Sequence, residues 1–288
     1  MIKIVGGLGL VIVLLYIYLL IPGGKLWQKY LADTEQSFAE ISGSREPSGK
    51  FSKDTVAQLP PLLQRHITNG GYLEKPLMSN MFIQFINTKF RLSPDKKTMP
   101  IQFQQLNFAG RPDRHAFLTA KMAGVLPLQA KDSVIAGIGS MTGVLAKHFQ
   151  LFRSTGAEMD QGQLITALAD AVYLPSLFVQ DFVTWRTIDE QTVEGCITWE
   201  NISAAGRFSF DEQGNIIRFD TDDRYMDDNG KGSKLVPWYV LYANYQNQNG
   251  FWQPGKVQVN WQLPEGAYTY FESNQIKIEY SVEKFPES

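Results

Sequence analysis

The N-terminal segment of the chain is uniformly apolar, and no other segment has a comparable pattern. Residues Ile4 to Ile21 run for eighteen positions without a charge, between Lys3 and Lys25. At about 1.5 Å per helical residue, such a helix reaches roughly 27 Å, which is close to the hydrocarbon thickness of a bilayer. The pattern predicts a transmembrane anchor in residues 1–24.

A cleaved signal peptide is the alternative interpretation of this segment. Signal peptides have an apolar core of roughly 7 to 15 residues and an A-x-A-like cleavage site. Here the apolar run is longer, and Ile21-Pro22-Gly23-Gly24 contains no such site. We therefore favour a retained single-pass anchor in the cell membrane. A very short N-terminal tail before a long chain places the domain on the extracytoplasmic, periplasmic side, although the flanking lysines are nearly balanced.

After the anchor, the apolar positions take a helical spacing. Lys25 to Glu40 predicts an amphipathic juxtamembrane helix, and Ser42 to Lys53 has the small, polar composition of a linker. We assign residues 25–54 to this helix and linker, and residues 55–288 to one β-rich domain. A short helix follows Pro60-Pro61 and ends at Asn69-Gly70-Gly71, because glycine suits a left-handed helix cap.

From Asn80 onward the apolar positions alternate with a period of two, which is typical of strands with one buried face. Turn residues such as Asp211 to Asn215 and Asn247 to Gly250 separate runs of about ten residues. This spacing is typical of an antiparallel meander. The predicted strands are 82–92, 101–108, 116–122, 183–187, 193–199, 205–210, 216–221, 256–263 and 275–280.

One helix interrupts the strands. Asp160 and Gln163 resemble a capping-box start, an apolar stripe follows, and Pro175 marks the end. The concave face of a curved sheet would bury that stripe. We therefore predict an α+β fold, predominantly antiparallel β, in which a strongly curved sheet or partly open barrel has one or two covering helices. The glycines in Gly137 to Gly143 fit neither a dinucleotide fingerprint nor a nucleophile elbow, and indicate a strand or bulge.

Composition excludes several classes of function. The net charge of −2 argues against a nucleic-acid partner, because phosphate binding needs a concentrated basic face. Cys196 is the single cysteine, so the chain can form neither an internal disulfide nor a cysteine-based zinc site. His66, His115 and His148 share no ligand-like spacing, and we interpret them as surface or helix-end residues. We predict no metal and no cofactor.

No catalytic motif is present in the sequence. Asp160 with Glu158 or Asp170 could form an acid/base pair, but Asp160 is already explained as a helix cap. Structural roles are favoured, and the chain is predicted not to be an enzyme. A hydrolase that uses Asp160 and Asp170 is the least supported alternative.

Aromatic residues on the apolar phase of the strands are the remaining signal. They fill a core in the simplest interpretation, but a curved sheet of this size can also enclose an apolar cavity. The candidate ligand-binding residues are Trp185, Arg224, Trp238, Trp261 and Tyr270. For Arg224 the favoured interpretation is an ion pair with Asp222 or Asp223 at a surface turn, and the alternative is a polar group at the cavity mouth.

Several short motifs together give the chain a family resemblance. They are Leu59-Pro60-x4-Arg65-His66, Glu158-x-Asp160-x-Gly162-x-Leu164, Phe210-Asp-Glu-x-Gly214, Asp223-Arg224-Tyr225, Pro237-Trp238, Tyr245, Gly250-x-Trp252-x-Pro254 and Trp261-x2-Pro264-x-Gly266-x3-Tyr270. In order and spacing they resemble an uncharacterised bacterial family of unknown function. The chain departs from that family at His66, Thr166 and Asp170, where Tyr, Arg and Glu are usual. The resemblance implies a β-rich shape like that of bacterial lipoprotein carriers, and it implies no reaction.

These observations lead to one main functional hypothesis. The protein is predicted to be membrane-anchored in the bacterial envelope and to bind a lipid or other apolar ligand in the cavity of its curved sheet. The alternative is a protein–protein interaction module at the membrane, which would use an exposed sheet edge or aromatic patch.

Overall fold

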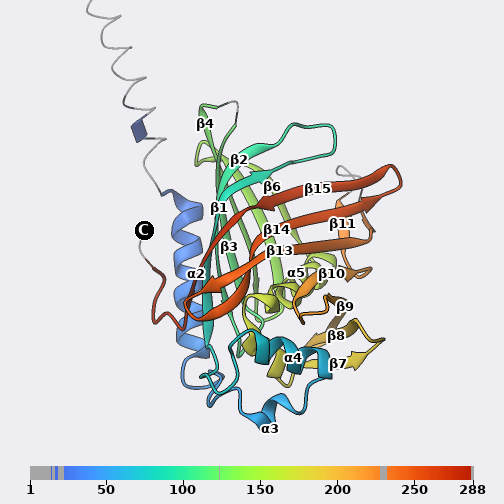
Figure 1. The fold of residues 1–288 in the computed structure, drawn as a ribbon. Coiled ribbons are helices and arrows are strands. Elements are labelled where there is room, and N and C mark those ends of the chain that lie inside the picture. The colour runs from blue at the N-terminus through green and yellow to red at the C-terminus, as the bar shows by residue number, and fades with distance from the viewer. Residues whose placement is uncertain (1–13, 15–16, 19–22, 123, 228–231, 287–288) are drawn as a thin grey trace, which may run out of the picture.

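The computed structural model describes residues 14, 17–18, 23–122, 124–227 and 232–286. Its body is a large antiparallel sheet with few helices (Figure 1). The helices are α2 (Lys25–Ile41), α3 (Lys53–Val56), α4 (Pro61–Asn69) and α5 (Ala157–Ala169), with short 3-10 turns η1 (Asp170–Val172) and η2 (Pro175–Val179). The strands are β1 (Asn80–Phe90), β2 (Met99–Phe108), β3 (Arg114–Met122), β4 (Leu126–Ile135), β5 (Ile138–Leu145), β6 (Phe149–Thr155), β7 (Val183–Thr187), β8 (Thr192–Trp199), β9 (Ile202–Phe210), β10 (Ile216–Thr221), β11 (Tyr225–Asp227), β12 (Ser233–Leu235), β13 (Trp238–Gln248), β14 (Phe251–Leu263), β15 (Gly266–Ser273) and β16 (Gln275–Tyr280).

The predicted membrane span at residues 4–21 lies almost entirely outside the described residues. Within the part of the chain that the structure does describe, no helix is long and apolar enough to cross a membrane. The anchor therefore stays a prediction.

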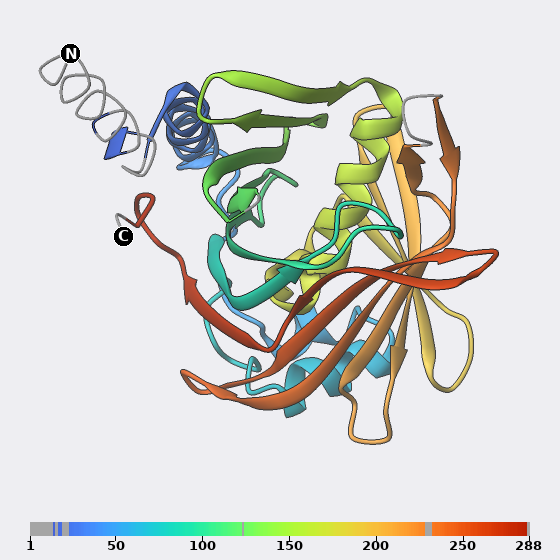
Figure 2. The same cartoon turned by 90° about the horizontal axis from the view of Figure 1, so that it is seen from above.

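One sheet of fourteen strands forms the body, and β11 and β12 form a separate pair. The hydrogen-bonded order is β6-β5-β4-β3-β2-β1-β15-β14-β13-β10-β9-β8-β7, with β16 also paired to β1. Seen from above, the sheet curls around α5 (Figure 2). Its two end strands, β6 and β7, are not paired with each other, so the barrel is not closed. The predicted antiparallel, β-rich fold is confirmed in this open form.

The sheet bends sharply at β1. Residues Met81 to Ile86 pair with β16, whereas Lys89 and Phe90 pair with β15. Between them the register with β2 shifts, and Asn87 has a positive φ of 52°. A bulge of this kind bends a strand and increases its twist. The bulge therefore lets one strand serve as the junction between two parts of the sheet.

Successive side chains of β3 point to opposite faces of the sheet. Ala116 and Leu118 point to the concave side, which holds α5. Phe117 belongs to a second apolar cluster with Tyr30 of α2 and Phe285. Because side chains alternate along a strand, one strand supplies both layers. The helix α2 thus covers the convex face, opposite α5 (Figure 1).

The predicted helix after the anchor is present as α2. Its buried residues recur every three or four positions, which places them on one face. Several of them are polar: Asp33 pairs with Lys131 at 2.8 Å, and Ser37 Oγ donates to Asp113 Oδ2 at 2.6 Å. Buried polar pairs, in addition to apolar contacts, hold α2 on β3 and β4.

Helix α5 begins earlier than the sequence indicates. Its N-cap is Gly156, so the prediction that Asp160 caps the helix is wrong. Asp160 Oδ1 instead accepts a hydrogen bond from the backbone N of Gly139 at 2.6 Å. A Cβ on Gly139 would lie 2.6 Å from the carbonyl oxygen of Met159, so the absence of a side chain lets α5 approach β5 closely.

Candidate functional site

A cavity of about 930 Å³ lies on the concave side, between α5 and the sheet. Its walls are mostly apolar and include Phe85, Phe103, Val259, Trp261, Trp238 and Phe271. Pockets that bind small molecules have volumes of roughly 300–1,000 Å³ and similar linings. In size and lining, this cavity resembles a ligand site.

The alternation of strands β13 and β14 explains the aromatic wall. Trp238 and Val240 line the cavity, while Tyr239 between them stacks under Arg218, with 4.0 Å from the guanidinium carbon to the ring centre. On the facing strand Val259 and Trp261 also point inward, and Trp238 pairs directly with Trp261. Two indoles therefore meet across the ladder on the concave face.

Small residues create the empty space opposite this wall. Ala116 of β3 and Ala130 of β4 line the cavity and are almost fully buried. Gly162 of α5 lines it as well. Each of these positions would fill part of the volume if it carried a larger apolar side chain.

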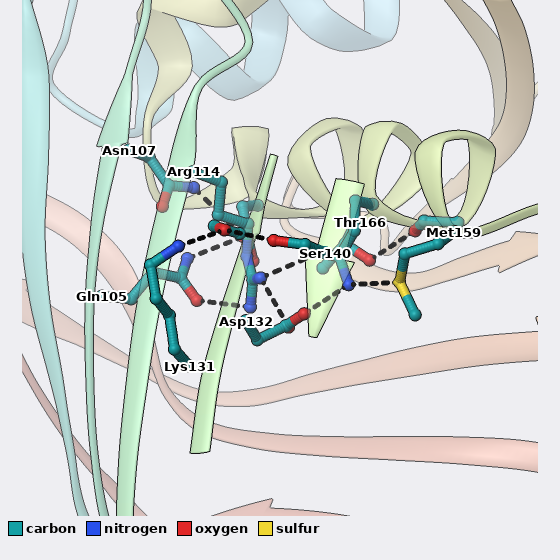
Figure 3. A network of polar contacts seen from close by, with 12 residues as sticks. Gln105, Asn107, Arg114, Lys131, Asp132, Ser140, Met159 and Thr166 are labelled. Atoms are coloured by element: carbon teal, nitrogen blue, oxygen red, sulfur yellow. Dashed lines mark hydrogen bonds and ion pairs between the residues drawn. The ribbon is translucent and has the colours of Figure 1, made fainter. Parts of the chain in front are cut away.

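A polar network centred on Arg114 forms one end of the cavity (Figure 3). Arg114 is 5% exposed, and it forms ion pairs with Asp132 Oδ2 at 2.9 Å and Asp170 Oδ2 at 3.1 Å. It also donates to the side-chain oxygens of Gln105 at 2.8 Å and Gln163 at 3.1 Å. Gln163 in turn donates to Asp132 Oδ1 at 2.5 Å. Four of the five N–H donors of the guanidinium thus have partners, which come from four elements.

Burial and pairing act in opposite directions on these charges. For Asp170, burial outweighs Arg114 and two amide donors and raises the pKa of the carboxyl. For Arg114, burial lowers the pKa, but Asp132 and Asp170 more than compensate and leave it raised. The network therefore keeps the Arg114 charge fixed.

Asp170 and Asp160 do not form the acid/base pair that the hydrolase alternative requires. They lie ten residues apart, which is about 15 Å along a helix. Asp160 binds the Gly139 backbone, whereas Asp170 accepts from Gln105, Asn107 and Arg114. Within the described residues, no group of three or more His, Cys, Asp or Glu side chains is placed to hold a metal ion.

Arg224 lies in the cavity wall, and the favoured prediction of a surface ion pair is wrong. Its guanidinium carbon lies 4.6 Å from the ring centre of Trp238 and 5.8 Å from that of Trp261. Nη1 donates to the carbonyl oxygen of Gly162 and to Thr166 Oγ1 on α5. Burial lowers the pKa of Arg224 below its usual value.

The carboxylates expected to pair with Arg224 have other partners. Asp222 pairs with Arg207 at 3.0 Å, and Asp223 Oδ2 accepts from the backbone N of Ala205 at 2.8 Å. Among the described residues, Arg224 has no ion-pair partner within 4.0 Å.

Four of the five predicted ligand-binding residues meet in the cavity. Arg224, Trp238, Trp261 and Tyr270 all line it, and Trp238 Nε1 donates to the Tyr270 hydroxyl at 3.0 Å. Trp185 does not line it. Its Nε1 donates to the carbonyl oxygen of Phe178 at 2.9 Å, and its ring packs on Phe178 and Phe208.

Sequence reasoning missed the Arg114 network. Its members Gln105, Arg114, Asp132 and Asp170 are scattered over 66 residues. One signal was available: Arg114 lies in phase with Ala116 and Leu118, so a charge interrupts the buried face of a strand. A charge at such a position needs buried partners.

Comparison with known proteins gives the family. Residues 49–273 match the model of a family of unknown function, DUF6544. The chain belongs to this family. No curated protein matches the sequence of this DUF6544 member.

The chain is similar to two crystal structures. One is an outer membrane lipoprotein-sorting protein domain from Vibrio parahaemolyticus, at 10% identity and a TM-score of 0.44. The other is a LolA superfamily protein from Nitrosomonas europaea, at 8% identity and a TM-score of 0.36. Each match covers 78% of the DUF6544 chain and 93% of the other chain.

Proposed function

We propose that this protein binds a lipid or another amphiphilic molecule in the concave cavity, while an N-terminal segment anchors it in the cell membrane on the extracytoplasmic side. One observation supports the binding most strongly: a cavity of about 930 Å³ with aromatic and aliphatic walls. Around Phe208, Phe210 and Phe219, by contrast, the interior is closely packed and these side chains are almost fully buried.

The energetics favour an apolar tail in this space. Each CH₂ group removed from water contributes about 0.8 kcal/mol. A tail of a dozen carbon atoms would therefore contribute on the order of 10 kcal/mol before the costs of ordering and immobilisation are subtracted. Without such a tail, the apolar walls of the cavity gain no comparable free energy.

The test is photocrosslinking of the full chain in its membrane with a fatty acid that carries a diazirine near the tail. We expect labelled peptides from β3, β13 and β14, because their inward residues line the cavity. Ala130→Phe adds an aromatic ring inside the cavity and should lower this labelling severalfold. Thr184→Phe adds the same ring at an exposed position on β7 and should leave it unchanged.

The distribution of label decides the outcome. Label confined to residues 1–22, with none in the strands that line the cavity, would contradict ligand binding in the domain.

A further inference from the structure

Arg224 has N–H donors that no described residue of the protein uses. A guanidinium offers five N–H donors in a planar fork. The Nη1 atom contacts Gly162 and Thr166, whereas Nε and Nη2 have no hydrogen-bond partner within the part of the chain that the structure describes. Arg224 is only half-buried, and it lines the cavity. These donors are therefore available to a molecule in the cavity.

Arg114 and Arg224, which both line the cavity, differ in this respect. Arg114 is neutralised by Asp132 and Asp170 and forms hydrogen bonds with two glutamines. Arg224 is held by a carbonyl and a hydroxyl, neither of which carries charge. A cation that is held partly out of water without a counter-ion is costly, and an oxyanion from a ligand would remove that cost.

The surroundings fix the Arg224 head group in place. Contacts to both indoles and to α5 hold its plane, so little side-chain entropy is lost when it binds a ligand. The charges of the cavity lining also favour an anionic ligand. Among the described residues, four arginines and three carboxylates line the cavity. They are Arg91, Arg114, Arg153, Arg224, Asp132, Glu158 and Asp170. One added negative charge would make the lining neutral.

We infer that the cavity selects amphiphiles with an acidic head group, a carboxylate or a phosphate, which Nε and Nη2 of Arg224 bind while the tail lies against the apolar wall. This inference rests on the proposed function and names the class of ligand. Two parallel hydrogen bonds from a guanidinium fork match the geometry of either oxyanion.

The experiment compares photoreactive probes with the same tail and different heads on the full chain in its membrane: a fatty acid, the fatty alcohol and the lysophosphatidate. We expect the acid and the lysophosphatidate to label cavity peptides on the order of tenfold to a hundredfold more efficiently than the alcohol. Hydrogen bonds between charged groups add binding free energy that corresponds to a ratio of this size. The more efficient of the two acidic probes identifies carboxylate or phosphate as the preferred head.

Arg224→Gln should reduce labelling by the acidic probes to the level of the alcohol and leave the alcohol unchanged. Arg186→Gln removes the same charge from a side chain that is 71% exposed outside the cavity, and should behave as the wild type. If the glutamine variant loses all labelling because α5 shifts, Arg224→Lys decides the question, since it keeps the charge and should retain the preference for acids.

The outcomes separate the two proposals. Equal labelling by acid and alcohol in the wild-type cavity would overturn the acidic-head inference and leave lipid binding intact. Labelling of the cavity by none of the probes would overturn both.

Discussion

Two histidines show how burial changes the chemistry of single residues. His66 Nδ1 donates to the carbonyl oxygen of Gly214 at 3.0 Å, and its ring packs against Phe178 and Phe210. His115 is fully buried, with Nε2 2.9 Å from Ser37 Oγ. Neither histidine lies at the surface, so that part of the interpretation is wrong. His66 does lie at a helix end, in the last turn of α4. Burial lowers the pKa of each ring to about 4.

These lowered pKa values predict acid sensitivity. The unfolded chain, with histidine pKa near 6.5, binds more protons than the folded chain between about pH 6.5 and 4, so stability falls as the pH falls through this window. Each histidine would contribute a loss of roughly 3 kcal/mol at the acid limit. Urea unfolding of His66→Asn at several pH values should show a lower free energy of unfolding at pH 7 and a shallower slope below pH 6.5.

The control for this prediction is the exposed His148. His148→Asn should keep the slope of the wild type. A slope that is the same for wild type and His66→Asn would show that His66 does not titrate in this window.

At the scale of elements, the sequence predicts strands well where polar and apolar faces remain distinct. β7 and β10 have the predicted bounds, and β16 does as well. β4 was missed because its two faces are mixed: Asp132 points to the cavity, and Lys131 is buried under α2. The partners that make these charges tolerable come from distant elements. A pattern based on polarity therefore cannot reveal this strand.

The buried pair between α2 and β4 gives a prediction at this scale. Lys131→Met would leave Asp33 with only its ion pair to the exposed Lys29, and removing one partner of a buried pair costs about 3–5 kcal/mol. Adding Asp33→Leu should recover most of this loss, because an apolar pair of similar volume is often as stable as a buried ion pair. Urea denaturation of the single and double variants measures both changes.

An exposed ion pair provides the comparison. Arg186→Met breaks the pair with Glu194, in which the arginine side chain is 71% exposed, and should cost little. A similarly small effect of Lys131→Met would show that the pair under α2 does not hold the helix.

At the scale of the whole molecule, the predicted concave sheet with an inner helix is observed, and the cavity has an apolar wall. Trp261 of the aromatic wall could be predicted because its strand alternates regularly, whereas Trp238 and Tyr270 lie on β13 and β15, which were not among the predicted strands. The polar end could not, since its shape depends on how β2, β3, β4 and α5 converge in space. Trp185 was misplaced because alternation gives the phase of a strand but not which part of the concave face it reaches.

The predicted anchor is tested at this scale by comparing the full chain with a fragment that begins at Gly23. The full chain should remain in the membrane pellet after a carbonate wash, because eighteen uncharged residues match the bilayer core. The fragment should be found in the supernatant and keep the same melting temperature, since α2 packs on the sheet through its own contacts. Protease added outside spheroplasts should digest the domain.

Recovery of the full chain in the supernatant would contradict the anchor. Protection of the domain from the protease until the cells are lysed would instead reverse its orientation.

The contact between Gly139 and the backbone of Met159 has an evolutionary consequence. A family member with even a methyl group at this position must hold its inner helix at a different distance from the strand, because a Cβ there would lie 2.6 Å from a carbonyl oxygen. Gly162, Gln163 and Thr166 on the same helix border the cavity, so its width would change with that distance. Variation at this one residue should therefore accompany differences in cavity width among relatives.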